Sequence, residues 1–238
     1  MIEDLAELAR ARRLCDWMFA QYAGEVRGDV AEVGAGIGTF TERILAAGPE
    51  RVLVLEPEPS SASLLARRFG ADPRVQVARE VLPEAPSLAA DNFDLIVCQN
   101  VLEHIEDDAA ALRAMAAALR SGGRLALLVP AHPRLYGRLD RRYGHHRRYT
   151  RPGLAALAEG AGLDVLGMHS FNLLGVPGWW VQNLRPSARI GRGSLAAYEA
   201  LLRVWRPVED RVAVPWGLSL ILHATPSHRA PRRRISGQ

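Results

Sequence analysis

The chain contains no lysine and only two cysteines in 238 residues. All of its basic side chains other than histidine are therefore arginine, which we interpret as coding bias from a GC-rich genome. Cys15 and Cys98 are expected to be buried thiols, so the sequence predicts neither a disulfide framework nor a cysteine zinc cluster. No apolar run is long enough to cross a bilayer, and residues 1–13 alternate acids and arginines rather than resembling a signal peptide. The sequence therefore predicts a cytoplasmic protein.

Strong positive charge is also lacking, because the net charge is only +4. Nucleic-acid binding by charge requires a basic patch or stripe, and dense arginine runs occur only at residues 141–148 and 229–234. The second run lies in a basic tail, residues 227–238, that we predict to be disordered and without function. No clear nucleic-acid partner is predicted. Since no linker or repeat divides the rest, residues 1–226 are expected to form a single domain.

The order of apolar runs and helical periodicities predicts an α/β fold with a doubly wound sheet. Helices are expected over residues 3–22, 39–47, 59–69, 107–120, 152–160 and 195–205. Strands are expected near residues 30–33, 51–55, 74–78, 93–98, 124–129, 163–168 and 217–224.

A glycine-rich segment follows the first of these strands, with the sequence Glu32-Val33-Gly34-Ala35-Gly36-Ile37-Gly38. Glycines at alternating positions let the main chain turn tightly and approach a ligand where a Cβ would obstruct it. The spacing G-x-G-x-G differs from the G-x-G-x-x-G of dinucleotide-binding folds. Because a strand precedes the loop and a helical pattern follows it, we expect a bound nucleotide-like ligand rather than an ordinary turn.

An acid ends the second predicted strand. Glu56 follows the apolar run at residues 51–55, and Pro57 and Pro59 stop the strand immediately after it. The carboxyl edge of an open α/β sheet is where ligands bind. A carboxylate at this edge can accept hydrogen bonds from both hydroxyls of a ribose, which we prefer to the interpretation of Glu56 as an ordinary surface acid.

Together these residues resemble a class I S-adenosylmethionine-dependent methyltransferase. Later landmarks of that family also occur in order, as Phe93-Asp94-Leu95-Ile96-Val97-Cys98-Gln99-Asn100-Val101-Leu102-Glu103-His104 and Leu119-Arg120-Ser121-Gly122-Gly123-Arg124-Leu125. The resemblance implies a Rossmann-like seven-stranded sheet, mostly parallel, with an antiparallel last strand inserted between its neighbours. It also implies S-adenosyl-L-methionine as cofactor, S-adenosyl-L-homocysteine as product, and cofactor contacts from Glu32, Gly34, Ala35, Gly36, Gly38, Glu56, Pro57, Asn100 and Val101.

Two segments exceed what the sheet needs, at residues 131–151 and 170–215. Long connections in compact domains are usually functional or disordered. The first should emerge at the carboxyl end of a strand and overhang the cofactor, so we interpret it as a substrate lid. The second carries Trp179 and Trp180, of which we expect Trp179 to face the acceptor pocket and Trp180 to pack against the body or a dimer partner. Acceptor contacts are predicted for Tyr136, His146, Arg148 and Trp179.

The lid resembles a signature of a bacterial subgroup of these enzymes, in which Pro130-Ala131-His132-Pro133 precedes Gly144-His145-His146-Arg147-Arg148-Tyr149-Thr150. The usual form has one histidine followed by an aromatic residue, so His145 is the better match and His146 is a departure. The subgroup's substrates are not defined as a class. The resemblance therefore supplies the position of a site and not an activity.

The candidate catalytic residues are His104, His145 and Tyr149. Methyl transfer is an in-line displacement, so a base is needed only when the acceptor carries a proton on the attacking atom. Histidine has a suitable unperturbed pKa for that task near neutral pH. The structural alternatives are a hydrogen-bonded histidine after the fourth strand for His104, and lid contacts for His145 and Tyr149.

A metal site is a further alternative for these residues. Glu103 and His104 with His132 or His145 could supply ligands, and some RNA-end and quinone methyltransferases carry Glu-x-x-Glu-His at this place. Asn100 replaces the first acid here, so the prediction is no metal, with a divalent ion as the minor alternative.

The favoured function is methyl transfer to the oxygen or nitrogen of a small molecule, such as a natural-product or lipid-like acceptor. The alternatives are a non-catalytic S-adenosylmethionine-binding partner protein and, with less support, a nucleotide-cofactor oxidoreductase of the same sheet class. The chain is expected to be a monomer or a homodimer.

Overall fold

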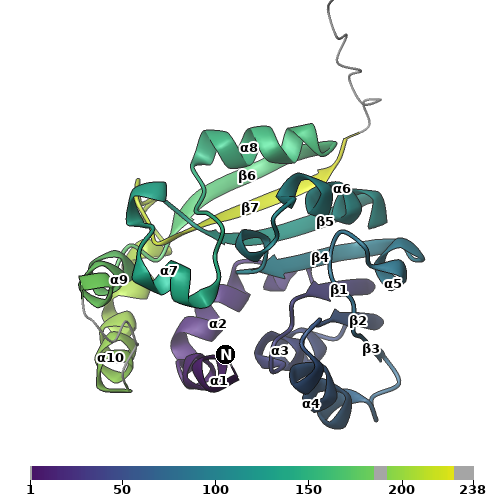
Figure 1. The fold of residues 1–238 in the computed structure, drawn as a ribbon, viewed down its shortest axis with the longest axis horizontal. Coiled ribbons are helices and arrows are strands. Elements are labelled where there is room, and N and C mark those ends of the chain that lie inside the picture. Colours follow the sequence, from purple (N-terminus) through teal and green to yellow (C-terminus); the bar gives the residue numbers. More distant parts are fainter. Residues whose placement is uncertain (1, 185–191, 228–238) are drawn as a thin grey trace, which may run out of the picture.

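The computed structural model describes residues 2–184 and 192–227 and contains a seven-stranded sheet (Figure 1). Its strands lie in the order β3-β2-β1-β4-β5-β7-β6. Their bounds are β1 Asp29–Val33, β2 Arg51–Leu55, β3 Val75–Ala78, β4 Phe93–Gln99, β5 Leu119–Pro130, β6 Leu163–Phe171 and β7 Ser219–Pro226. Of the predicted tail at residues 227–238, only Ser227 lies within the described residues.

Helices cover both faces of the sheet, with α6 and α8 on one face and α2, α3 and α4 on the other (Figure 1). The helices are α1 Ile2–Ala9, α2 Arg12–Ala20, α3 Thr39–Ala46, α4 Pro59–Phe69, α5 Pro86–Ala89, α6 Asp108–Ala118, α7 Arg138–Tyr143, α8 Arg151–Gly160, α9 Gly175–Leu184 and α10 Arg192–Glu209. Single 3₁₀ turns occur at η1 Ala23–Glu25, η2 Leu102–His104 and η3 Pro133–Leu135.

The predicted sheet topology is confirmed. The strands β3, β2, β1, β4 and β5 pair in parallel, and β7 pairs antiparallel with both β5 and β6. The central strands are mainly apolar because each is buried on both faces. β5 begins earlier than expected, since Leu119 pairs with Phe93 before a register shift leads into the regular ladder at Arg124.

Three non-glycine residues with positive φ mark the carboxyl edge of the sheet. Among the described residues these are Asn100 (φ 51°), His132 (φ 61°) and Asn172 (φ 65°), and they follow β4, β5 and β6 respectively. Because those three strands are parallel to one another, the three residues lie at one edge. Sparsely populated backbone conformations concentrate at functional sites. The chain therefore reverses sharply at the edge where the sequence predicts the ligand.

The N-terminal segment forms two helices where the sequence predicts one over residues 3–22. The break falls at Arg10 and Ala11, whose N–H groups bond three residues back, to the carbonyl oxygens of Glu7 and Leu8. The start of α2 is capped from a distance, because the carboxylate of Glu199 on α10 accepts hydrogen bonds from the N–H groups of Arg13 and Leu14, each at 3.0 Å. A carboxylate stabilises a helix N-terminus through its unsatisfied N–H groups and its dipole. This partner lies about 185 positions away in sequence, so local periodicity carries no sign of it.

Both predicted insertions contain helices. The first forms η3 and α7, and the second forms α9 and α10, which is longer than the expected 195–205. Trp17 of α2 anchors the second insertion, because its ring packs on Phe171 with centroids 4.2 Å apart and its indole N–H donates to Asp210 at 2.7 Å. No helix among the described residues is long and apolar enough to cross a membrane.

Candidate functional site

The glycine loop connects β1 to α3 in a conformation that requires its glycines. Gly34, Gly36 and Gly38 have φ of 74°, 58° and 84°, which is the left-handed region. A Cβ on Gly34 would overlap the side chain of Val101, which follows β4. The N–H groups of Gly34 and Ala35 bond to the carbonyl oxygen of Leu55 at 2.8 and 3.2 Å, which fixes the loop against the end of β2.

Glu56 meets this loop directly. Its Oε2 accepts a hydrogen bond from the N–H of Gly36 at 2.7 Å, and its Oε1 accepts one from the N–H of Glu58 at 3.0 Å. Burial raises the pKa of the Glu56 carboxyl, and these two hydrogen bonds oppose the shift. Each carboxylate oxygen has a second lone pair. The acid and the loop that the sequence predicts to share a ligand therefore lie in contact.

Glu32 lies beneath the loop rather than in it. Its side chain is buried and accepts a hydrogen bond from the hydroxyl of Thr41 at 2.5 Å, which ties the end of β1 to the first turn of α3. Burial raises the pKa of Glu32 to about 7, with the nearby Glu56 adding to the shift and Thr41 opposing it. In this geometry Glu32 stabilises the loop between β1 and α3 through its hydrogen bond with Thr41.

Main-chain bonds join the two ends of the lid to each other and to the end of β5. The N–H of Tyr149 donates to Pro130 and the N–H of His132 donates to Tyr149, each at 2.9 Å. In its middle, the N–H of His146 donates to the carbonyl oxygen of Glu103 at 2.8 Å. The lid therefore lies directly against η2, the turn after β4.

A buried ion pair organises the interior of the lid. The carboxylate of Asp140 accepts hydrogen bonds from the guanidinium of Arg148 at 2.7 Å and shares one with Nδ1 of His145 at 2.9 Å. Burial opposes ionisation of Asp140, but these two partners hold the pKa of its carboxyl below the usual range. The guanidinium of Arg148 also stacks over the ring of Trp179 at 4.6 Å. Arg148 therefore joins the two insertions.

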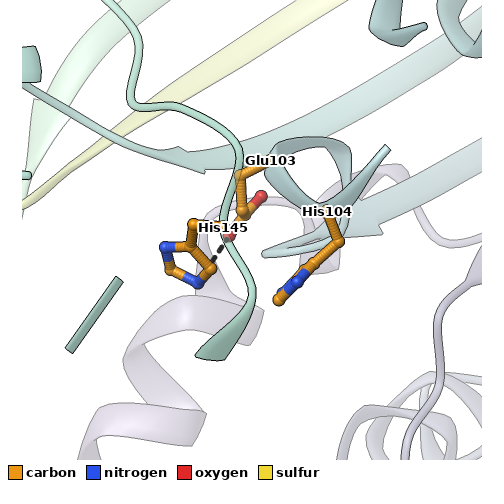
Figure 2. A group of neighbouring side chains, drawn as sticks. All are labelled: Glu103, His104 and His145. Carbon is orange, nitrogen blue, oxygen red and sulfur yellow. Dashed lines mark ion pairs between the residues drawn. The ribbon is translucent and has the colours of Figure 1, made fainter. Parts of the chain in front are cut away.

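Glu103, His104 and His145 come together where the lid meets η2 (Figure 2). Nε2 of His145 lies 3.9 Å from Oε1 of Glu103, and the two imidazole rings meet edge-on with centroids 4.8 Å apart. Glu103 is fully buried, and neither of its carboxylate oxygens has a hydrogen-bond partner among the described residues. Burial raises the pKa of Glu103 to about 8, whereas burial and the neighbouring His145 lower the pKa of His104 to about 4.

Other predicted site residues take different positions. The hydroxyl of Tyr149 donates to Asp108 at 3.0 Å, and burial raises the pKa of that hydroxyl. The hydroxyl of Tyr136 donates to the carbonyl oxygen of His145 at 2.8 Å, and the side chain of His146 is exposed. Trp180 is 58% exposed, so within the described residues it is not buried against the body, and the other expectation, that it contacts a dimer partner, stays a prediction.

The sequence alone does not reveal how Asp140 and Glu103 act within the site. Asp140 is a typical exposed residue by type, and its burial becomes visible only once Arg148 is placed beside it. Glu103 is predicted only as a possible metal ligand, because nothing local indicates that a Glu-His pair after a strand is enclosed. The spacing of Asp140 and His145 is a usable signal, since a carboxylate beside a histidine commonly orients its ring.

A comparison with protein-family models matches a methyltransferase domain to residues 6–167. The chain belongs to the class I S-adenosylmethionine-dependent methyltransferases. This confirms the predicted family, and the methyl donor of this methyltransferase is S-adenosyl-L-methionine.

Curated relatives of the methyltransferase include two ubiquinone biosynthesis O-methyltransferases. The protein from Aeromonas salmonicida is 26% identical over 172 residues, covering 65% of this chain and 71% of the relative. The protein from Xanthomonas euvesicatoria is 31% identical over 159 residues, covering 58% and 65%. The matched segment of this chain thus spans about two thirds of the length of these relatives.

Among solved structures, the methyltransferase is similar to the N-methyltransferase NodS from Bradyrhizobium japonicum, which was solved in complex with S-adenosyl-L-homocysteine. The TM-score is 0.58 at 17% identity, with 92% of this chain and 87% of the other covered. At this identity the likeness supports the predicted Rossmann-like fold.

Proposed function

We propose that the chain transfers the methyl group of S-adenosylmethionine to a hydroxyl oxygen of a small molecule held between the carboxyl edge of the sheet and the lid. The observation that carries this proposal is the juxtaposition of two sites. The loop of Gly34 to Gly38 with Glu56, and the lid cluster of Glu103, His104 and His145, converge on the turn after β4. A methyl donor and an acceptor must meet in this way for an in-line displacement.

The cofactor is proposed to lie along the carboxyl ends of β1, β2 and β4. Left-handed glycines leave the main chain of the loop open to close approach, and Glu56 retains lone pairs for the ribose hydroxyls. Val101 faces the same loop from the turn after β4, as its contact with the position of Gly34 indicates, and Asn100 directly precedes it in that turn. We assign the donor's sulfonium end to this turn.

The acceptor is proposed to bind under the lid, with its reactive atom beside His104 and His145. Oxygen is favoured over nitrogen because the two curated relatives described above are named O-methyltransferases. Arg148 and Trp179 form the wall where the two insertions meet. An aromatic side chain with a buried cation above it suits a flat, partly apolar acceptor that carries a hydroxyl.

The first experiment measures binding of S-adenosylhomocysteine by calorimetry. We expect micromolar affinity for the natural chain and a loss of at least about tenfold in Glu56→Gln, because an amide cannot accept hydrogen bonds with both of its atoms. Glu50→Gln is the matched control, since Glu50 is exposed and lies at the opposite end of β2. Equal losses of affinity in both variants would mean that Glu56 does not contact the cofactor.

The second experiment measures transfer of a labelled methyl group from S-adenosylmethionine to a panel of phenols, catechols, amines and carboxylic acids. We expect turnover with hydroxylated aromatic acceptors. Turnover with amines alone would overturn the oxygen assignment. Tight binding of S-adenosylhomocysteine without any turnover would favour a non-catalytic binding protein.

A further inference from the structure

The carboxylate of Glu103 has no visible use for its two oxygens. The side chain is fully enclosed, and among the described residues no N–H or O–H group donates to either oxygen. An enclosed carboxylate is costly unless hydrogen bonds or a close cation offset its desolvation, and Nε2 of His145 pairs with Oε1 of Glu103 only at 3.9 Å. Arg148, a buried cation whose charge acts on Glu103, is already engaged by Asp140 and Ala131. Within the described residues, Glu103 therefore lacks a cation at hydrogen-bond distance.

Two imidazole nitrogens face the same space. One ligand atom from each of Glu103, His104 and His145 lies within 4.8 Å of the others, and this is the one such group of three among the described residues. Figure 2 shows Glu103 and His104 arriving from the turn after β4, with His145 entering from the lid. Histidine nitrogen and carboxylate oxygen at this separation are the usual ligands of a divalent transition-metal ion.

His145 is oriented as a metal-binding histidine would be. Its Nδ1 hydrogen-bonds to Asp140 at 2.9 Å, which leaves Nε2 on the side of Glu103. Histidines that bind metals almost always place their second ring nitrogen on a carboxylate or carbonyl, which fixes the ring and its tautomer. Asp140 is in turn fixed by Arg148, so the orientation of the ring is set by buried groups.

We propose that Glu103, His104 and His145 bind one divalent transition-metal ion, with zinc the best match. Two nitrogen donors and one oxygen donor suit zinc, cobalt or manganese, whereas magnesium and calcium prefer all-oxygen sites. Three protein ligands leave a coordination position open to a hydroxyl. When bound, such an ion would lower the pKa of that hydroxyl; this role in the reaction rests on the proposed function, whereas the site itself does not.

The lid histidine explains how the site exists without the acid that related motifs carry at the position of Asn100. Asn100 has a left-handed backbone and takes no part in the group of three. His145 supplies the third ligand from the other side. One ligand therefore comes from the lid and two from the turn after β4, so a bound ion would also hold the lid against η2.

The test uses the untagged full chain after dialysis against a chelator. Zinc binding is measured by calorimetry and cobalt binding by visible absorption, with magnesium and calcium in parallel. We expect one zinc or cobalt ion per chain and no measurable binding of magnesium or calcium. Glu103→Gln and His145→Asn should each lower zinc affinity by at least about 100-fold, the upper range for loss of a supporting residue.

His169→Asn is the matched control, because His169 is an imidazole on β6 that pairs with Gln21 at 3.0 Å and lies outside the group of three. It should bind zinc as the natural chain does. Binding of S-adenosylhomocysteine and the thermal unfolding midpoint, both measured without metal, establish that each variant is folded. Absence of zinc binding by the natural chain, or equal affinity in all three variants, would overturn the proposal.

The outcome is separable from that of the proposed function. Methyl transfer by a chain that binds no metal would refute the metal site and leave the methyltransferase proposal standing. Zinc binding with the expected variant pattern, but no methyl transfer to any acceptor, would refute the proposed function and leave the metal site standing.

Discussion

Main-chain geometry shapes the glycine loop, whereas buried side chains hold the lid. The loop depends on left-handed glycines and on N–H groups directed at Leu55 and Glu56. The lid depends on Asp140, whose one carboxylate orders both His145 and Arg148. A loop of the first kind tolerates side-chain changes nearby but no added Cβ. A lid of the second kind fails when a single charge is removed.

The largest effect is expected from Arg148→Met, which leaves the enclosed Asp140 carboxylate without its cation. The side chains of this pair are 1% and 0% exposed, and breaking a buried pair costs about 3–5 kcal/mol. Arg147→Met is the control, because the Arg147 side chain is 33% exposed, so solvent screens its pair with Asp108 and the loss of stability should be smaller. Urea unfolding of both variants measures the difference. Similar losses in the two would mean that the buried pair is not the element that holds the lid.

Gly34→Ala tests the opposite side of the comparison. A left-handed alanine costs about 1–2 kcal/mol, and crowding against Val101 adds about 1–3 kcal/mol. Gly48→Ala separates these contributions, because Gly48 also has a positive φ of 83° but its added Cβ would meet nothing within 4 Å. We expect Gly34→Ala to lose both stability and binding of S-adenosylhomocysteine, and Gly48→Ala to lose only about 1 kcal/mol of stability.

The double variant Gly34→Ala/Val101→Ala isolates the crowding. Trimming Val101 removes the atoms that the new Cβ would meet, so part of the lost stability should return. If the double variant loses as much stability as the two single variants together, the entire cost of Gly34→Ala comes from backbone strain.

These two regions also differ in how far the sequence could predict them. The glycine loop and Glu56 are local patterns next to apolar runs, so their meeting at one edge followed from the order of the strands. The antiparallel β7 between β5 and β6 was expected from the family resemblance and not from its composition. The cap that Glu199 places on α2, and the enclosure of Glu103, depend on residues far away in sequence, which no local pattern encodes.

A smaller effect, dependent on pH, is expected beneath the loop. The pKa of Glu32 is about 7 in the folded chain and near 4.5 in the unfolded chain, so the folded state binds more protons between these values. Its contribution to stability is therefore fully present at low pH and is lost as the pH rises toward 7 and above. Glu32→Gln mimics the protonated form. The natural chain should lose on the order of 2 kcal/mol relative to this variant between pH 5 and pH 8.

Urea unfolding gives the free energy of unfolding of the natural chain and of Glu32→Gln at pH 5 and at pH 8. The gap between the two chains is then compared at the two pH values, so that the effects of other titrating groups cancel. A constant gap between the two chains would mean that Glu32 is already ionised at low pH. Glu32 would then be an exposed group that is able to contact the cofactor, rather than a buried residue that stabilises the loop.

The smallest effect is expected from Tyr149→Phe, and it decides between two roles for the lid tyrosine. The hydroxyl donates to Asp108 at 3.0 Å, while Arg147 continues to pair with the same carboxylate at 2.7 Å. Loss of one such hydrogen bond should cost about 1 kcal/mol of stability. Because the hydroxyl is engaged by Asp108 and is not part of the group of Glu103, His104 and His145, the rate of methyl transfer at saturating substrate should stay within about twofold, a change equivalent to less than about 0.5 kcal/mol. If turnover instead slowed by roughly two orders of magnitude while stability stayed unchanged, Tyr149 would be part of the chemistry and the acceptor would lie on the Asp108 side of the lid.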